Sequence, residues 1–300
     1  MLDPRLLRTY AAVCREGSIS GAARRLNISQ PSVSVAIAQL ERRLGTSLFE
    51  RSRQGIVLTA AGRALRGRAE AMETLLADAA EEVTLATKGV LGPLRIAGTP
   101  GALVSLVPQA IGPMEEHGRF ALQILERPDA ELNDLLRTGE IEIAVATTGI
   151  DRQPADIEER SVVRDPFALI VGRAHDALGP AVSLAEVAEF GWVLPEAYGA
   201  FHRQIEALFL GTGVPFPTDV IRCDSLLTTK AIVRRTARVC VLPRGVVSAE
   251  LSIGVLRAVR LSENVTRAIG VRTLRDRPLS VLADRFVQAI SSRRMEVSFS

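Results

Sequence analysis

Lysine, histidine, cysteine and aromatic residues are all scarce in this chain of 300 residues. Lys88 and Lys230 are the only lysines, so nearly all of the 37 basic residues are arginines. We attribute that bias to genome composition. No apolar run is long enough for a membrane-spanning helix, and the N-terminus has no secretory apolar region. We therefore expect a cytoplasmic protein with no membrane partner.

The few side chains that bind metals or form disulfides are scattered. The three cysteines are odd in number and far apart, and the three histidines have no ligand spacing. These residues are Cys14, Cys223, Cys240, His117, His175 and His202. The sequence predicts no disulfide framework, no metal site and no cofactor.

Charge divides the chain into two parts of opposite sign. Residues 1–68 hold 12 arginines and four acidic residues, a net charge of +8. The remainder holds 25 basic and 30 acidic residues, a net charge of −5. A basic head on an acidic body indicates that only the head meets a polyanion such as DNA.

Two short helices are predicted within residues 18–44. Ser18 or Ser20 can cap the first, whose inward residues are small alanines, and Asn27 suits its left-handed end. Ser29 caps the second helix, and Pro31 fits its first turn. Its core-facing stripe is predicted to be Val33, Ile37, Leu40 and Leu44.

A basic hairpin follows the helix pair. The run from Ser47 to Thr59 predicts two strands joined by a Gln54-Gly55 turn, with Arg51 and Arg53 available for phosphates or a minor groove. A preceding helix, closed by Gly17, completes the order of a winged helix-turn-helix. This order predicts sequence-specific binding to double-stranded DNA.

A long helix is predicted from Thr59 to about Thr87. Apolar residues recur along it at alternating steps of four and three, which is a heptad pattern that favours pairing with a second copy. The alternative is a helix that packs on its own domain. The candidate dimerisation residues are Leu65, Ala69, Met72, Leu76, Ala79 and Val83.

From Leu94 onward, predicted strands and helices alternate, which indicates a parallel sheet covered by helices. Strands near 158–172 and 264–272 are expected to cross between two lobes. A cleft between two α/β lobes is a typical small-molecule site. The fold class is therefore α/β overall, with a mainly helical head.

The segments GSISGAARRLNISQPSVSVAIAQLERRLGTSLFER and LTAAG resemble the signature of LysR-type transcriptional regulators. The resemblance covers essentially the whole chain. It implies a winged helix-turn-helix at 1–58, a dimerising linker helix at 59–88 and a periplasmic-binding-protein-like effector domain at 89–300. Lobe I would comprise about 91–162 and 267–300, and lobe II about 163–266. The resemblance also implies a homodimer or homotetramer on promoter DNA, and RNA polymerase as a further partner.

The recognition helix departs from the family pattern. Where the family often has long polar or basic side chains, this chain has Val35 and Ala38. We expect base specificity to depend on apolar contacts, DNA shape and the wing arginines. The candidate DNA-binding residues are Ser20, Gln30, Pro31, Ser32, Ser34, Val35, Arg51 and Arg53.

Candidate effector contacts lie where predicted strands end. The loop from Thr99 to Ala102 opens a helix, whose free N–H groups favour a carboxylate, and the resemblance implies inducer contacts in this loop. Each threonine here can instead be a simple helix cap. The candidates are Thr99, Pro100, Gly101, Ala102, Thr147, Tyr198, Phe201, His202 and Ser225.

Three other functions are less consistent with the residues. An enzyme would need a phosphate loop, a Ser/His/Asp constellation or a metal set, and none is found. A passive nucleoid-type DNA binder would not need the acidic two-lobed body. An exported solute-binding protein would need a signal peptide. We expect a regulator, not an enzyme, that responds to a small organic acid.

Overall fold

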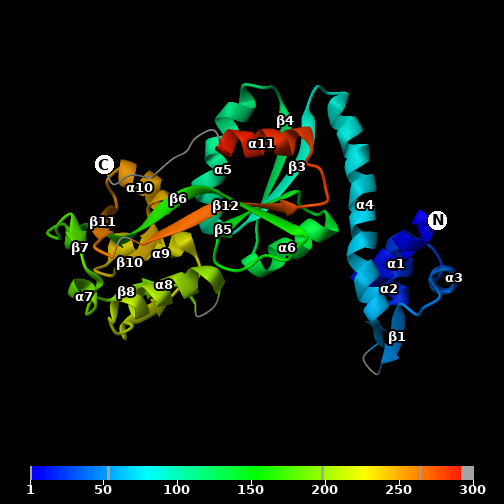
Figure 1. The fold of residues 1–300 in the computed structure, drawn as a ribbon, viewed down its shortest axis with the longest axis horizontal. Coiled ribbons are helices and arrows are strands. Elements are labelled where there is room, and N and C mark those ends of the chain that lie inside the picture. The colour runs from blue at the N-terminus through cyan, green and yellow to red at the C-terminus, as the bar shows by residue number, and fades with distance from the viewer. Residues whose placement is uncertain (1, 53–54, 197–198, 264, 292–300) are drawn as a thin grey trace. The chain divides into compact units, whose positions relative to one another are not determined.

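The computed structural model describes residues 2–52, 55–196, 199–263 and 265–291. The chain forms two compact units (Figure 1). The first, the N-terminal unit, comprises residues 1–93 and 134–142; the second, the C-terminal unit, comprises residues 94–133 and 143–300. Within the described residues, no helix is long and apolar enough to cross a membrane.

Three helices and a hairpin form the first part of the N-terminal unit. Ser18, not Ser20, caps α2 by accepting a hydrogen bond from the Gly21 N–H, and Ser29 caps α3 through Ser32. Asn27 ends α2 in the left-handed conformation, with φ of 54°. The elements are α1 (Pro4–Glu16), α2 (Ile19–Leu26), α3 (Gln30–Leu44), β1 (Phe49–Ser52) and β2 (Gly55–Leu58). Residues 53 and 54 of the predicted turn lie outside the described residues.

The core of this unit includes Tyr10, Val33, Ile37 and Leu40, each less than a tenth exposed. Tyr10 donates a buried hydrogen bond of 2.7 Å from its hydroxyl to the Gly62 carbonyl, which ties α1 to α4. Burial raises the pKa of the Tyr10 hydroxyl. The predicted stripe on α3 was wrong at its last position. Leu44 is 37% exposed, because it occupies the final turn before the left-handed Gly45.

The linker helix α4 (Ala60–Ala86) starts at Thr59, which accepts a hydrogen bond from the Gly62 N–H. The apolar residues of its heptad pattern form two groups: one packs against the core of the N-terminal unit, and the other is exposed. Ala69 is fully buried in the core of its own unit, so assigning it to a dimer contact was wrong. Leu65 is half-buried against the same core, and its dimer contact stays a prediction. Farther along, Leu76 and Val83 are 57% and 66% exposed.

A mixed sheet runs through the C-terminal unit in the order β4-β3-β5-β12-β6-β11-β7, with β10 also paired to β6. The prediction of a parallel sheet was wrong in its centre. β12 runs antiparallel to both β5 and β6, because the chain returns from lobe II along β12 and enters the sheet between these two strands. A Cβ at Gly270 would collide with the Arg160 carbonyl, so the close approach of β12 to β6 needs glycine there.

The strands of this unit, with their bounds, are β3 (Leu91–Gly98), β4 (Phe120–Glu126), β5 (Ile143–Thr148), β6 (Ile157–Val171), β7 (Ala181–Val182), β8 (Trp192–Leu194), β9 (Val220–Arg222), β10 (Cys240–Pro243), β11 (Arg257–Leu261) and β12 (Thr266–Leu274). The helices are α5 (Pro100–Glu115), α6 (Asp129–Thr138), η1 (Arg173–His175), α7 (Leu184–Val187), α8 (Gly199–Thr212), α9 (Leu226–Arg235), η2 (Arg244–Val247), α10 (Ser248–Ser252) and α11 (Val281–Ser291). β3 and α6 each have residues in both units.

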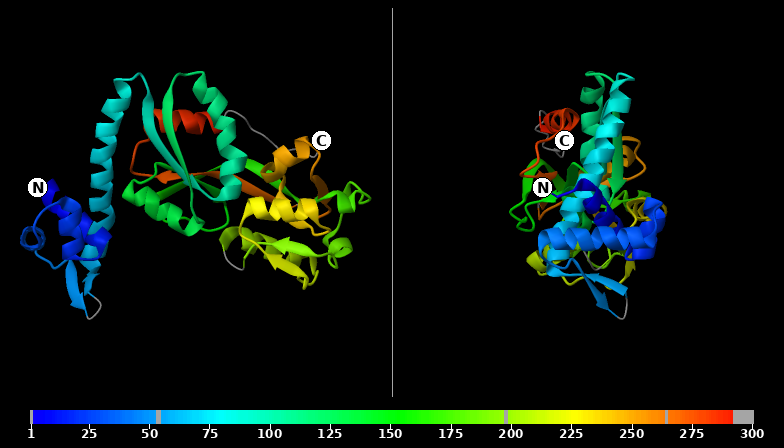
Figure 2. Two further views of the ribbon diagram at one scale, coloured as in Figure 1. Left: turned by 180° about the vertical axis from the view of Figure 1, so that it is seen from behind. Right: turned by 90° about the vertical axis from the view of Figure 1, so that its right-hand side faces the viewer.

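Separate hydrophobic cores define the two lobes. In lobe I, α5 and α11 lie side by side over the sheet formed by β3, β5 and β12 (Figures 1 and 2). In lobe II, β8 and β9 form a parallel pair beside β10, and α8 packs Phe209 against Trp192. The apolar clusters of lobe II draw on residues between Phe167 and Leu261. Among the described residues, β6 contributes to both cores, with Val163 in lobe I and Phe167 in lobe II, and β12 pairs along it.

Two leucines of α3 that differ in burial provide a test of the core assignment. Leu40 is fully buried and Leu44 is over a third exposed. We expect Leu40→Ala to lower the free energy of unfolding of the N-terminal unit by about 2–5 kcal/mol. Leu44→Ala should lower it by less than about 1 kcal/mol. Hydrogen exchange of the α1–α3 amides measures both, and equal losses would contradict this assignment of the core.

Candidate nucleic-acid interface and ligand pocket

The first part of α3 presents a smooth exposed face. Gln30, Pro31, Ser32 and Ser34 are exposed, and Val35 is 62% exposed. Ser32 is fixed by a 2.8 Å hydrogen bond with the Ser29 hydroxyl. These short side chains carry no charge, so the helix backbone can approach base edges closely in a major groove.

Cationic side chains flank this face. Arg24 and Arg25 in the last turn of α2 are exposed, as are Arg42 and Arg43 at the end of α3. Residue counting alone did not single them out, although they contribute to the positive charge of the head. Such side chains are suited to phosphate contacts, which position a protein on DNA.

The remaining predicted DNA contacts are less completely described. Ser20 is half-buried on α2. Arg51 lies in β1 opposite Ile56 in the hairpin. Arg53 lies outside the described residues. The DNA-contact roles of all eight candidates stay predictions.

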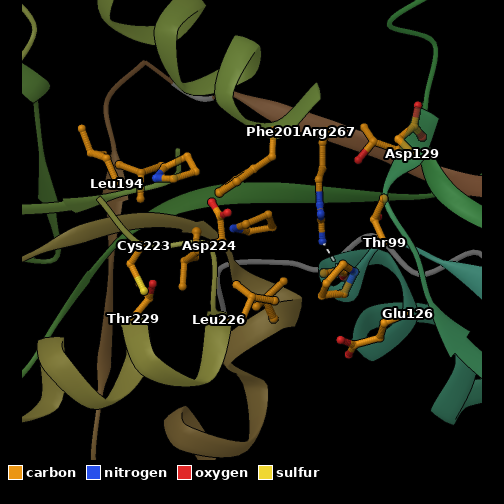
Figure 3. A pocket seen from close by; sticks show the side chains of 18 of the residues that line it. Thr99, Glu126, Asp129, Leu194, Phe201, Cys223, Asp224, Leu226, Thr229 and Arg267 are labelled. Atoms are coloured by element: carbon orange, nitrogen blue, oxygen red, sulfur yellow. Dashed lines mark hydrogen bonds between the residues drawn. The ribbon is translucent and has the colours of Figure 1, made fainter. Parts of the chain in front are cut away.

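In the C-terminal unit, a cavity of about 400 Å³ lies between the lobes; we call it the Thr99 pocket. That volume is in the range of sites for small metabolites. Figure 3 shows side chains from both lobes pointing into it. Its lining comprises Thr99, Pro100, Gly101, Glu126, Arg127, Pro128, Asp129, Thr147, Val193, Leu194, Pro195, Phe201, Cys223, Asp224, Leu226, Thr229, Val241, Leu242, Pro243, Val246 and Arg267.

The N-terminus of α5 forms one end of the Thr99 pocket. Thr99 is the N-cap residue, but its side chain makes no capping hydrogen bond. Its hydroxyl is therefore available to a ligand in the cavity. The carbonyl of Thr99 accepts hydrogen bonds from the N–H groups of Ala102 and Leu103. The Gly101 N–H precedes these two in the first turn of α5, where backbone N–H groups have no intrahelical acceptor. This end favours a negatively charged group.

Arg267 lies at the same end, almost fully buried, and extends between Phe201 and Thr99 (Figure 3). Its Nη2 donates to the Gly101 carbonyl at 2.9 Å, to Ser105 Oγ at 3.2 Å and to Asp165 Oδ2 at 3.1 Å. Burial lowers the pKa of the guanidinium, and the negative charge of Asp165 opposes that shift. Its Nε is buried and has no hydrogen-bond partner among the described residues.

Asp165 joins this arginine to lobe II. Its Oδ1 accepts a hydrogen bond of 3.0 Å from the Gly245 N–H at η2, while its Oδ2 faces Arg267. The pair therefore connects α5, β6, β12 and η2 at the point where the lobes meet.

The rest of the lining is of two kinds. The lobe II wall is apolar, with side chains from β8, α8, α9 and β10 that include Leu194, Phe201 and Leu242. Carboxylates also reach the pocket. Asp129 forms a 3.0 Å ion pair with Arg272, and Asp224 accepts a hydrogen bond from the Glu196 N–H.

Five of the nine predicted effector contacts line the pocket: Thr99, Pro100, Gly101, Thr147 and Phe201. Three others do not. Ala102 is fully buried in the core of lobe I, since it points inward from the first turn of α5. His202 lies on α8 near Glu206, and Ser225 caps α9 by accepting from the Thr228 N–H. Tyr198 lies outside the described residues.

Sequence reasoning missed the segment from Glu126 to Asp129 and the buried Arg267. The first had a usable signal, because it follows a strand and opens α6 just as the Thr99 loop opens α5. Arg267 had none, because it lies inside an apolar strand pattern and its partner Asp165 is 102 residues away.

The cysteines do not form a reactive cluster. Burial raises the pKa of the Cys14 and Cys240 thiols, which keeps them protonated. Cys223 lines the Thr99 pocket, where its thiol contacts the Ser225 carbonyl at 3.5 Å. No group of three histidine, cysteine or acidic side chains in the described residues could hold a metal ion.

Sequence profiles of known families match both units of the chain. The profile of the LysR substrate binding domain matches residues 87–294, and that of the bacterial regulatory helix-turn-helix protein, lysR family, matches residues 4–63. The chain belongs to the LysR family of transcriptional regulators. It is thus a DNA-binding regulator with a substrate-binding domain, and this family is not enzymatic.

Relatives match nearly the whole length of this LysR-type chain. It is 26% identical over 297 residues to the HTH-type transcriptional regulator PcaQ of Agrobacterium fabrum, which covers 97% of this chain and 96% of that protein. The structure of CbnR complexed with its target DNA has a TM-score of 0.65 at 21% identity, with 96% and 99% covered. LysG of Corynebacterium glutamicum with bound effector Arg also has a TM-score of 0.65 at 21% identity, with 97% of each chain covered. The two structural matches show the shared fold.

The buried ion pair between Arg267 and Asp165 makes a stability prediction. Arg267→Met leaves the Asp165 charge buried without its partner, so we expect the free energy of unfolding to fall by about 3–5 kcal/mol. The double variant with Asp165→Leu should recover part of that loss, because neither charge is then buried. Chemical denaturation of the C-terminal unit measures both. Arg260→Met, at an exposed arginine on β11, is the control, and an equal loss there would overturn this assignment.

Proposed function

We propose that this LysR-type regulator binds a pseudo-palindromic promoter site as a homodimer or homotetramer. A small carboxylate-bearing metabolite in the Thr99 pocket controls that binding. The observation that carries the proposal is the polar end of the pocket. The Thr99 hydroxyl, which makes no capping hydrogen bond, lies there with the N-terminus of α5 and the Arg267 guanidinium. The same chain carries the DNA-binding helix α3.

The lining of the pocket narrows the chemistry of the effector. A carboxylate gains from the helix dipole and from hydrogen-bond donors at the Thr99 end. The apolar wall around Leu194 and Phe201 suits a short aliphatic or aromatic body. Glu126 and Asp224 favour an effector that also carries a hydroxyl or amine donor. This combination describes a hydroxylated or amino-substituted organic acid.

DNA recognition in this proposal depends on the smooth face of α3. The exposed Val35 fits a thymine methyl group, while Gln30, Ser32 and Ser34 supply hydrogen bonds to base edges. Arg51 and Arg53 of the wing contact phosphates or the minor groove. With so few polar base contacts, DNA shape contributes a large share of specificity.

Oligomerisation in this proposal uses the part of α4 that follows Ala69. Met72, Leu76, Ala79 and Val83 continue the heptad pattern beyond the buried Ala69, and the last three are exposed. A second copy paired along this strip sets the spacing of two recognition helices. Effector binding shifts the population of lobe orientations, which changes that spacing, the bend of promoter DNA and access for RNA polymerase.

The effector site is tested with Thr99→Val, which keeps side-chain volume but removes the hydroxyl. A thermal-shift screen of aliphatic, hydroxylated and aromatic carboxylic acids on the full chain first selects a binder. Losing one hydrogen bond to its carboxylate costs about 1.5–3 kcal/mol, so we expect the Kd to rise about 10- to 100-fold. Isothermal titration calorimetry measures this change.

The control for this test is Thr228→Val, an exposed threonine on α9 that does not line the pocket. Fluorescence anisotropy with promoter DNA then reports whether the selected acid alters the affinity. Normal titration of the Thr99→Val protein would rule out the proposed contact. DNA binding and bending that are identical with and without the acid would rule out its role as the effector.

Base recognition is tested with Val35→Ala. Removing two methyl groups from the exposed face of α3 should weaken the preference for thymine at one position in each half-site several-fold. Selection from a randomised DNA pool, followed by sequencing, measures the change. Val104→Ala, at a 46% exposed valine of the C-terminal unit, is the matched control. Unchanged site selection by the Val35→Ala protein would refute the assignment.

A further inference from the structure

An ion pair joins the two lobes beside the Thr99 pocket. Arg203 of α8, in lobe II, donates from its Nη2 to Asp151 Oδ2 at 2.6 Å, and Asp151 lies between β5 and β6 in lobe I. Neither residue lines the pocket itself. Thr147, near the end of β5, and Phe201, in the first turn of α8, both line it. The ion pair therefore borders the cavity on the side formed by β5 and α8.

Hydrogen bonds within lobe I fix the loop that carries Asp151. The Gly149 N–H donates to Glu159 Oε1 at 2.9 Å. The Gln153 side chain donates to the Asp151 carbonyl at 3.3 Å and accepts from Asn133 of α6 at 3.1 Å. All of these partners belong to lobe I, so the position of Asp151 follows that lobe.

Lobe II fixes the position of Arg203. Ile205, Leu208 and Phe209 of α8 are buried in the core of lobe II, which ties the helix to that lobe. Arg203 itself is exposed on the same helix. Because the two charges belong to different lobes, their 2.6 Å contact depends on the spacing of the lobes.

This ion pair differs in burial from the Arg267–Asp165 pair. The side chains of Arg267 and Asp165 are 4% and 1% exposed, so separating them leaves two charges in an apolar interior. Those of Arg203 and Asp151 are 51% and 60% exposed. Water solvates both charges when the exposed pair separates, so this pair opens at little cost. The exposed contact suits a reversible closure, and the buried contact suits a permanent junction.

We propose that the Asp151–Arg203 ion pair is a latch that holds the lobes together beside the Thr99 pocket and slows exchange of the effector. This inference rests on the function proposed above, in which lobe orientation responds to the effector. When the pair breaks, the lobes separate on the side of β5 and α8, while the buried Arg267–Asp165 junction stays intact. When the pair forms, the effector is enclosed.

Cys223 provides a probe of lobe separation that needs no effector. It lines the Thr99 pocket, whereas burial raises the pKa of the Cys14 and Cys240 thiols and slows their alkylation. The full chain is treated with a maleimide that carries a neutral polyethylene glycol chain, which is too bulky for a cavity of about 400 Å³. Peptide mass spectrometry then measures the alkylation rate at Cys223. A neutral reagent is not steered by the charges that the variants change.

Loss of the ion pair should speed alkylation of Cys223. Arg203→Gln should raise the rate about two- to fivefold, the shift expected when one exposed ion pair is lost. Arg203→Glu should raise it further, because two carboxylates then face each other, and adding Asp151→Arg should restore the wild-type rate. Added NaCl should speed alkylation of the wild-type protein and leave the Arg203→Gln protein unchanged. Rescue by exchange of the two charges is not expected of a residue that only supports the fold.

Arg260→Glu is the matched control, because Arg260 is exposed on β11 in lobe II and does not line the Thr99 pocket. Equal rates in the wild-type and Arg203→Glu proteins, or no rescue by Asp151→Arg, would overturn the latch. The acid selected for the Thr99 pocket gives a separate readout. It should slow alkylation of Cys223 in the wild-type protein, and stopped-flow measurements should show faster release from the Arg203→Glu protein. If no acid binds or protects Cys223, the proposed function fails, while the alkylation rates without acid still decide the latch.

Discussion

The buried ion pair between Arg267 and Asp165 organises the C-terminal unit. Two opposite charges removed from water are stabilised by hydrogen bonds from the groups around them. Here those partners come from the first turns of α5, from the two long strands and from η2 of lobe II. The pair therefore fixes the junction of the lobes, and it also places a cation at the polar end of the Thr99 pocket. Ligand recognition and lobe geometry depend on the same side chain.

Residues 1–68 and residues 69–300 differ in the sign of their net charge. The N-terminal unit presents an uncharged helix face flanked by exposed arginines, so attraction to DNA comes from the rim while the centre can approach base edges. Residues 69–300 carry a net charge of −5, and the C-terminal unit places the buried Arg267 at the Thr99 pocket. The net negative charge of residues 69–300 limits non-specific binding of this part of the chain to DNA.

Residues with strong local backbone preferences made the helix ends of the N-terminal unit predictable from the sequence. Asn27, Ser29 and Pro31 mark helix ends through their own backbone preferences, and the structure confirms them. Errors arose where packing decided the outcome. Ala69 fitted a heptad, but whether that face meets the same unit or a second copy is not encoded in the repeat. Strand direction in β12 likewise depends on pairing with residues about a hundred positions away.

The candidate pocket was only half predictable for the same reason. Thr99 and Thr147 follow strands, so their positions at a sheet edge could be inferred from the order of elements. Arg267 looks like an interruption of an apolar strand until Asp165 is placed beside it. Long-range partners of this kind leave no periodic signal in a single sequence.

The order of synthesis gives the β6–β12 crossing a further consequence. The core of lobe II draws on residues between Phe167 and Leu261, one uninterrupted stretch of chain. Lobe I begins earlier, with β3 and α5, yet its sheet needs β12 between β5 and β6, and its core needs α11. On the ribosome, lobe I must therefore wait, with its apolar strands uncovered, until lobe II has emerged. The lobe that starts first is completed last.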